Sequence, residues 1–164
     1  ATLRLGAAFP TSLAASCLCK MRPQDAANTL WAAATIRLQD PMRTPLDSKT
    51  VEAQWTSRDV AASLWAYATA QSNPGSETMQ TLCEASLRTA HRANGQDVAN
   101  MLWALATLGE NVASSLQQMQ TLAEVVSVRR PGAPSLRPQE LANSVWALAA
   151  CGVHHKEFFC LARV

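Results

Sequence analysis

The sequence contains a motif that recurs four times, and this repetition restricts the folds open to the chain. The four segments align without gaps and share a tryptophan: PQDAANTLWAAAT (23–35), SRDVAASLWAYAT (57–69), GQDVANMLWALAT (95–107) and PQELANSVWALAA (138–150). The tryptophans Trp31, Trp65, Trp103 and Trp146 are 34, 38 and 43 residues apart. A period near 38 residues is typical of a unit of two helices and two turns.

Each copy of the motif carries the signals of a helix start. Pro23 and Pro138 occupy a first-turn position, where proline is favoured. An acidic residue follows two positions later in every copy and faces the unpaired amides and the positive end of the helix dipole. These acidic residues are Asp25, Asp59, Asp97 and Glu140. Thr56 with Asp59 and Asn94 with Asp97 have the spacing of a capping box. Gly109 and Gly152 are predicted to end two of the helices.

The apolar residues of each copy form a face too wide for a lone surface helix. In the third copy one apolar stripe contains Val98, Leu102, Leu105 and Leu108, and a neighbouring stripe contains Ala99, Trp103 and Ala106. A helix with such a face must be covered on two sides, as in a stack of repeats.

A second helix is predicted between the motif helices. The segments 76–90 and 114–129 contain the related runs MQTLCEASL and MQTLAEVVS, 40 residues apart. Segments 47–54, 11–21 and 155–164 are expected to be the equivalents in the other units. The sequence therefore predicts an all-α fold, an α-solenoid of tandem helix-turn-helix repeats of about 38 residues. The expected units are 1–21 (partial), 22–56, 57–93, 94–136 and 137–164 (partial).

Composition limits the remaining possibilities. Hydrophobic residues make up 48% of the chain and aromatic residues 5%, a balance that suits close helix packing better than a β-sandwich. The longest apolar runs are too short for a membrane span. Five cysteines without framework spacing favour a reducing compartment. We expect the chain to begin after a removed presequence or inside a longer protein.

Catalysis and metal binding find no support in the sequence. It has no Gly-rich phosphate loop and no GxSxG or HExxH motif, so we expect neither an enzyme nor a small-molecule substrate or cofactor. Cys151, His154, His155 and Cys160 are close together, but Cys151 aligns with apolar residues of the other copies and is expected in the core. No second CxxC pair accompanies them, and no metal site is predicted.

The run PQDxANxLWALAxLG resembles the octotricopeptide repeat family, whose repeats of about 38 residues form two helices. Related repeats occur in FAST-kinase-like and RAP-domain proteins. The second copy departs from the pattern at Arg58 and Ala62, and the first has Arg37 in place of the closing glycine. The resemblance implies sequence-guided binding of single-stranded or ribosomal RNA in a mitochondrion or plastid, in transcript processing, stabilisation or translation, or as an organellar ribosomal protein.

A polar stripe on the motif helices provides candidate RNA-binding residues. Spacings of four and seven or eight residues place its members on one face, where amides could hydrogen-bond base edges. The stripe contains Gln24, Asn28 and Thr35; Arg58 and Thr69; Gln96, Asn100 and Thr107; and Gln139 and Asn143. The asparagines have a structural alternative, a hydrogen bond to the backbone of the next repeat. Variable neighbours are candidates for base specificity, namely Thr29, Ser63, Met101 and Ser144.

Arginines are the candidates for phosphate contacts. Arg22 and Arg137 both precede the first-turn proline, and Arg58 lies one residue inside its helix. Arg88, Arg92, Arg129 and Arg130 gather near the ends of the second helices, where a cation also complements the helix dipole. The four motif tryptophans could stack on bases, but we expect them to pack in the core. Trp55 is either a packed turn anchor or an exposed contact.

Two functions remain open. RNA binding follows from the resemblance, whereas the modest net charge of +2 favours a protein–protein scaffold within a large organellar complex, contacting neighbouring proteins and no membrane. If Arg22, Arg58 and Arg137 share an open face with the glutamines, RNA binding is favoured. An apolar or covered face would favour the scaffold.

Overall fold

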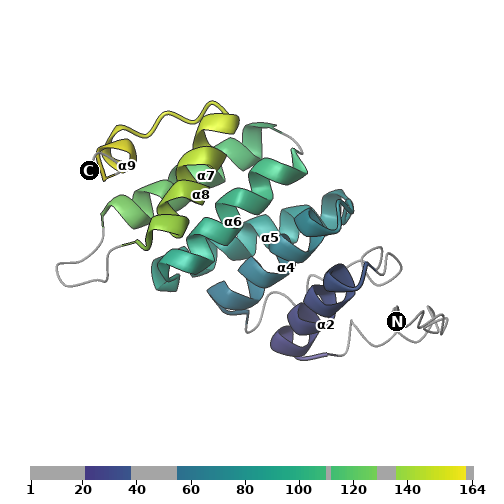
Figure 1. Ribbon diagram of the computed structural model, residues 1–164. Helices are drawn as coiled ribbons and strands as arrows, with labels where there is room; N and C mark the ends of the chain where they lie inside the picture. The colour runs from purple at the N-terminus through teal and green to yellow at the C-terminus, as the bar shows by residue number, and fades with distance from the viewer. Residues whose placement is uncertain (1–20, 38–54, 110–111, 129–135, 162–164) are drawn as a thin grey trace, which may run out of the picture.

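Tandem helical hairpins stack in sequence order and form an α-solenoid. A computed structural model describes residues 21–37, 55–109, 112–128 and 136–161, and all regular structure in these ranges is helical. The first helices of the hairpins lie side by side in one layer, each against the next in the chain (Figure 1). They are α2 (Pro23–Thr35), α4 (Ser57–Thr69), α6 (Gly95–Leu108) and α8 (Pro138–Ala150).

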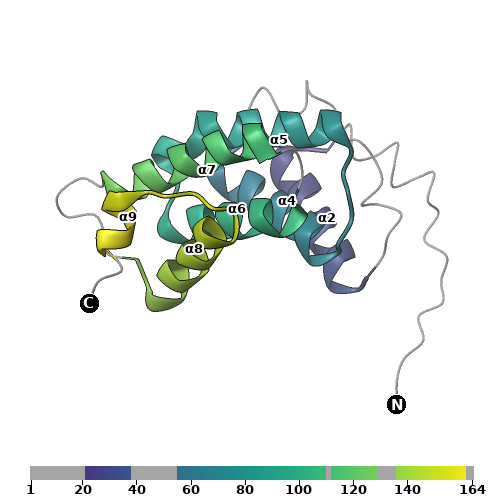
Figure 2. The ribbon, with the colours of Figure 1, turned by 90° about the horizontal axis from the view of Figure 1, so that it is seen from above.

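A second layer covers one side of the first. It contains α5 (Ser76–Thr89), which continues into the short 3-10 helix η2 (Ala90–Arg92), and α7 (Val112–Ser127), packed beside α5. Figure 2 shows α5 and α7 running along one side of the first-helix layer. The short helix α9 (Lys156–Leu161) packs against α7 and buries Phe158.

The predicted helices are confirmed with small shifts at their ends. The motif helices begin and end as expected, except that the third extends by one residue to Leu108. The second helices predicted over 76–90 and 114–129 are present as α5 and α7. The prediction over 155–164 corresponds to α9 within the described residues, whereas those over 47–54 and most of 11–21 fall outside them.

The residues predicted to cap the helices form the expected hydrogen bonds and backbone turns. The side chains of Thr56 and Asn94 accept hydrogen bonds from the backbone amides of Asp59 and Asp97, and each Asp accepts one back from the cap residue's amide. Gly109, after α6, has a left-handed backbone with φ of 63°. The first copy lacks this glycine, and Arg37 adopts the same conformation with φ of 59°. The fold therefore places Arg37 in the left-handed conformation, which a residue with a side chain adopts less readily than glycine does.

The core lies between the two layers and between neighbouring first helices. Leu30, Leu64 and Leu102 directly precede motif tryptophans, Leu148 follows Trp146 by two positions, and all four leucines are fully buried. Trp55 is only 5% exposed and belongs to this core, so it is a packed anchor before α4. No helix in the described ranges has the length and apolar character needed to cross a membrane.

The buried thiol of Cys83 on α5 gives a prediction about reactivity. Burial raises its pKa to about 11, so at pH 8 it is both protonated and shielded, whereas Cys160 on α9 is exposed. Because the thiolate is the reacting species, brief iodoacetamide treatment at pH 8 should modify Cys160 well before Cys83. Peptide mass spectrometry measures the two rates, and treatment in denaturant is the control in which both should react. Equal rates of modification of Cys83 and Cys160 in the folded protein would contradict the burial of Cys83.

Candidate nucleic-acid interface

The first helices present one stripe of side chains to solvent, and it is the polar stripe of the motif. On α4, neighbouring first helices cover two sides and α5 covers a third, which leaves Arg58, Ala62, Trp65 and Thr69 as the more accessible positions. The equivalent positions on α2, α6 and α8 are accessible as well. We call this surface the amide–tryptophan face; it contains Gln24, Asn28, Trp31, Arg58, Ala62, Trp65, Gln96, Asn100, Trp103, Gln139, Asn143 and Trp146.

The expectation that the motif tryptophans pack in the core is wrong for Trp31 and Trp146. Trp31 is 50% exposed and Trp146 is 51% exposed, while Trp65 is half-buried on the same face. Trp103 is half-buried and packs against the core. The reason is helical geometry: Gln24, Asn28 and Trp31 lie within an arc of about 60° around the helix. The tryptophan therefore shares the face of the amides, and in the first three copies the leucine before it is the core residue.

The candidate residues for base specificity do not lie on the amide–tryptophan face. Ser63, Met101 and Ser144 are buried, with exposed fractions of 1% or less, so they cannot contact a ligand on the face. Thr29 is half-buried, and its hydroxyl donates a hydrogen bond to the carbonyl of Asp25. These positions follow the asparagine by one residue, a rotation of about 100° that turns them toward the packed interior.

A groove of about 660 Å³ opens on the amide–tryptophan face across α2, α4 and α6. It brings together aromatic, amide and cationic side chains from three successive repeats. The rings of Trp31 and Trp65 are stacked, with centroids 6.4 Å apart and planes inclined by 26°. The groove is lined by Asn28, Trp31, Arg58, Ala61, Ala62, Trp65, Asn94, Gln96, Asp97 and Asn100.

Among the described residues, Asp97 is the one acidic residue that lines this groove, and its carboxylate is already hydrogen-bonded within the protein. Its carboxylate accepts hydrogen bonds from the backbone amide of Asn94, at 3.3 Å, and from the Ser57 hydroxyl of the preceding repeat, at 2.8 Å. The side chain is 7% exposed. The carboxylate therefore serves to cap α6 and to tie α4 to α6.

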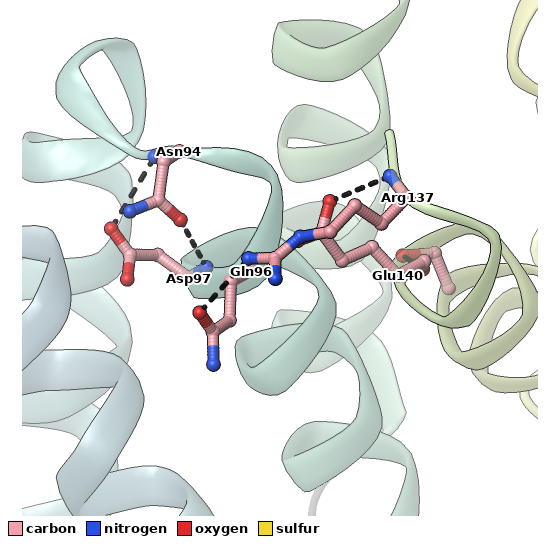
Figure 3. Close-up of polar contacts among 6 residues, drawn as sticks. Asn94, Gln96, Asp97, Arg137 and Glu140 are labelled. Carbon is pink, nitrogen blue, oxygen red and sulfur yellow. Dashed lines mark hydrogen bonds and ion pairs between the residues drawn. The ribbon is translucent and has the colours of Figure 1, made fainter. Parts of the chain in front are cut away.

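A smaller hollow of about 110 Å³ lies between α6 and α8 on the same face. Arg137 reaches across it, and its guanidinium nitrogen lies 3.4 Å from the side-chain oxygen of Gln96 (Figure 3). The same side chain is anchored by Glu140, with Nε 2.8 Å from Oε1. Gln96 and Asn100 line both hollows, so the two are neighbours on one surface.

The three candidate phosphate-binding arginines differ in their pairing. Arg22 forms two hydrogen bonds to Asp25, of 2.8 and 3.2 Å, which lower the pKa of that carboxyl. Arg137 forms one side-chain ion pair with Glu140, of 2.8 Å, and both arginines keep most of their side chains in solvent. Arg58 is exposed in the groove and forms no ion pair among the described residues. Arg58 and Arg137 line the two hollows of this face together with Gln96, whereas Arg22 lines neither of them.

The candidate amides are accessible. Gln24, Asn28, Gln96 and Gln139 are exposed, and Asn100 and Asn143 are half-buried. In the part of the chain that the structure describes, none of the three asparagine side chains hydrogen-bonds to the backbone of the next repeat. Their donors and acceptors are therefore available to a ligand.

The remaining candidate cations and ligands lie away from this face. Arg88 and Arg92 are exposed at the end of α5 and in η2, whereas Arg129 and Arg130 fall outside the described residues. No group of three or more His, Cys, Asp or Glu side chains within the described ranges could hold a metal ion. Cys151 is half-buried beside the core, and burial raises its pKa.

Comparison with known proteins finds no matching family model, no curated protein and no solved structure. The resemblance to octotricopeptide repeats therefore depends on the four motifs alone, and the function has to be inferred from the fold and from the amide–tryptophan face.

Proposed function

We propose that this chain is an RNA-binding helical-repeat protein that holds single-stranded RNA along its amide–tryptophan face. The observation that carries the proposal is the 660 Å³ groove, which combines the exposed indole of Trp31, the half-buried indole of Trp65, the amides of its asparagines and the Arg58 guanidinium. Successive first helices repeat the same elements, so a strand could follow the stack from α2 to α8.

Each component of the face has a role in binding a single strand. Indole rings stack on unpaired bases, whatever the base identity. Asn and Gln side chains both donate and accept, so they can pair with exposed base edges. Guanidinium groups bind phosphate through charge-assisted hydrogen bonds. A duplex would offer neither its base faces nor its Watson–Crick edges, which is why a single-stranded RNA or an unpaired loop is the expected ligand.

The cellular setting is part of the proposal and depends on the sequence resemblance. Octotricopeptide-like repeats point to expression of mitochondrial or plastid genes, through processing, stabilisation or translation of transcripts. Binding to ribosomal RNA as a subunit of an organellar ribosome is a second setting for the same surface. In that case neighbouring proteins of the assembly would be partners as well.

The competing function is a protein–protein scaffold that uses the same face. Exposed tryptophans are common at the energetic centres of protein interfaces, and the net charge of +2 is low for a nucleic-acid binder. The face nevertheless carries at least as many amides and guanidiniums as indoles, and a polar surface of this kind suits a strand that presents phosphates and base edges.

The deciding experiment is a titration of the folded chain with a pool of single-stranded RNA over a series of salt concentrations. We expect binding at low salt that weakens with a slope of about −0.7 in log K against log salt for each phosphate contacted. Duplex RNA of matched length is the control and should bind more weakly. A helical, folded sample that binds no RNA at low salt would reject the proposal and favour the scaffold.

A further inference from the structure

The second repeat departs from the others at two positions that line the 660 Å³ groove. Three copies have Gln and Asn at the first two positions of the face, whereas the second has Arg58 and Ala62. Ala62 lines the 660 Å³ groove, but the hollow between α6 and α8, where Asn143 of the fourth copy takes the place of Ala62, measures 110 Å³. The loss of an amide side chain at position 62 therefore coincides with the open space.

The walls of this space are chemically asymmetric. The stacked indoles of Trp31 and Trp65 provide an aromatic surface on α2 and α4. Asn28 on α2 and Asn100 on α6 present amides, and Arg58 presents an exposed cation. Among the described residues, Trp31 and Trp65 are the one stacked pair of tryptophans, so this aromatic surface occurs at this groove alone.

We infer that this groove is a nucleotide subsite that accepts one base of the bound RNA strand together with its phosphate. The base stacks on the Trp31–Trp65 pair, the amides of Asn28 and Asn100 face its edge, and Arg58 binds the phosphate. The inference rests on the proposed function and deepens it, because it assigns the second repeat a role that the other repeats do not share.

The volume of the groove and the side chains that line it favour a nucleotide as the ligand. Its volume lies within the range of about 300–1,000 Å³ that is usual for sites binding small organic groups, whereas the α6–α8 hollow falls below that range. A nucleotide is the ligand that offers a flat aromatic ring, a hydrogen-bonding edge and an anion together. An apolar protein side chain would leave the amides and the guanidinium without partners, at a cost in binding free energy.

The test fills the groove with the residue that the other copies carry. Ala62→Asn restores the repeat pattern, and the helical propensity cost of the change is small, so the variant should remain folded by circular dichroism. Ala32→Asn makes the same substitution at an exposed position of α2 outside the groove and serves as the control. Affinity is measured with a single-stranded oligoadenylate probe at fixed salt.

We expect Ala62→Asn to weaken oligoadenylate binding by at least about fivefold, the lower end of what one stacked base contributes, and Ala32→Asn to leave it unchanged. Trp31→Ala should cause a similar loss, and Trp31→Phe should retain most of the affinity.

The outcomes separate this subsite from the function on which it rests. If the wild-type chain binds RNA with the expected salt dependence but Ala62→Asn binds equally well, the subsite is overturned and the proposed function stands. The subsite is also overturned if Trp31→Ala binds the oligoadenylate as tightly as the wild-type chain. Absence of any RNA binding by the wild-type chain rejects both.

Discussion

Leu102→Ala is expected to lower the free energy of unfolding by about 2–5 kcal/mol, the usual range for a fully buried leucine. Leu102 is 0% exposed on α6, which packs against α4, α7 and α8. Truncation removes apolar burial and leaves a cavity that packed helices fill only in part. Chemical denaturation followed by circular dichroism measures the change. In a stack of repeats each unit depends on its neighbours, so a central cavity weakens the stack on both sides.

Leu87→Ala provides the matched control for this prediction. Leu87 lies on α5 and is 38% exposed, so the same truncation should cost less than about 1 kcal/mol. If the two variants were destabilised equally, the core described between the helix layers would be wrong.

Charge reversal of Arg22, Arg58 and Arg137 to Glu is expected to weaken RNA binding by at least about tenfold at low salt and to flatten its salt dependence. Three lost phosphate contacts should reduce the slope of log K against log salt by about 2. Among single variants, Arg58→Glu should have the largest effect, because Arg22 and Arg137 already share their charge with Asp25 and Glu140.

A triple variant of equal charge distinguishes a local site from a general electrostatic effect. Arg88, Arg92 and Lys156 lie on α5, η2 and α9, and their reversal to Glu changes the net charge by the same amount. RNA affinity should fall much less in this control. An equal loss in both triple variants would mean that RNA responds to the total charge of the molecule and not to the amide–tryptophan face.

The helices and their order could be predicted from the sequence because their signals are local. Pro23, Pro138 and the capping pairs Thr56–Asp59 and Asn94–Asp97 mark helix starts, and the structure places the helix starts at these signals. Repetition of the same motif then indicates stacking, since each helix has an apolar face too wide to be covered once.

Residue type alone mispredicts the exposure of Trp31 and Trp146, because the position of a residue on a helix decides which face it occupies. Tryptophan among alanines and leucines is most often a core residue. The signal that contradicts this was present: Trp31 follows Asn28 by three residues and Gln24 by seven, so all three share one side of the helix. Ser63 and Met101 were misplaced for the same reason, as polar or variable residues that nevertheless face the interior.

The groove itself could not be deduced from the sequence. Arg58 and Ala62 are visible as departures from the repeat, but the space that Ala62 leaves depends on how closely α2, α4 and α6 approach. The contact of Arg137 with Gln96 likewise joins two repeats, 41 positions apart, and follows from the side-by-side packing of α6 and α8.

The central claim is that RNA lies on the first-helix layer, and ultraviolet cross-linking of bound single-stranded RNA followed by peptide mass spectrometry tests it most directly. We predict cross-links in the peptides that carry Trp31, Trp65 and the Gln96–Asn100 segment, all on the amide–tryptophan face. Cross-links confined to peptides of α5 and α7, in the opposite layer, would contradict the account.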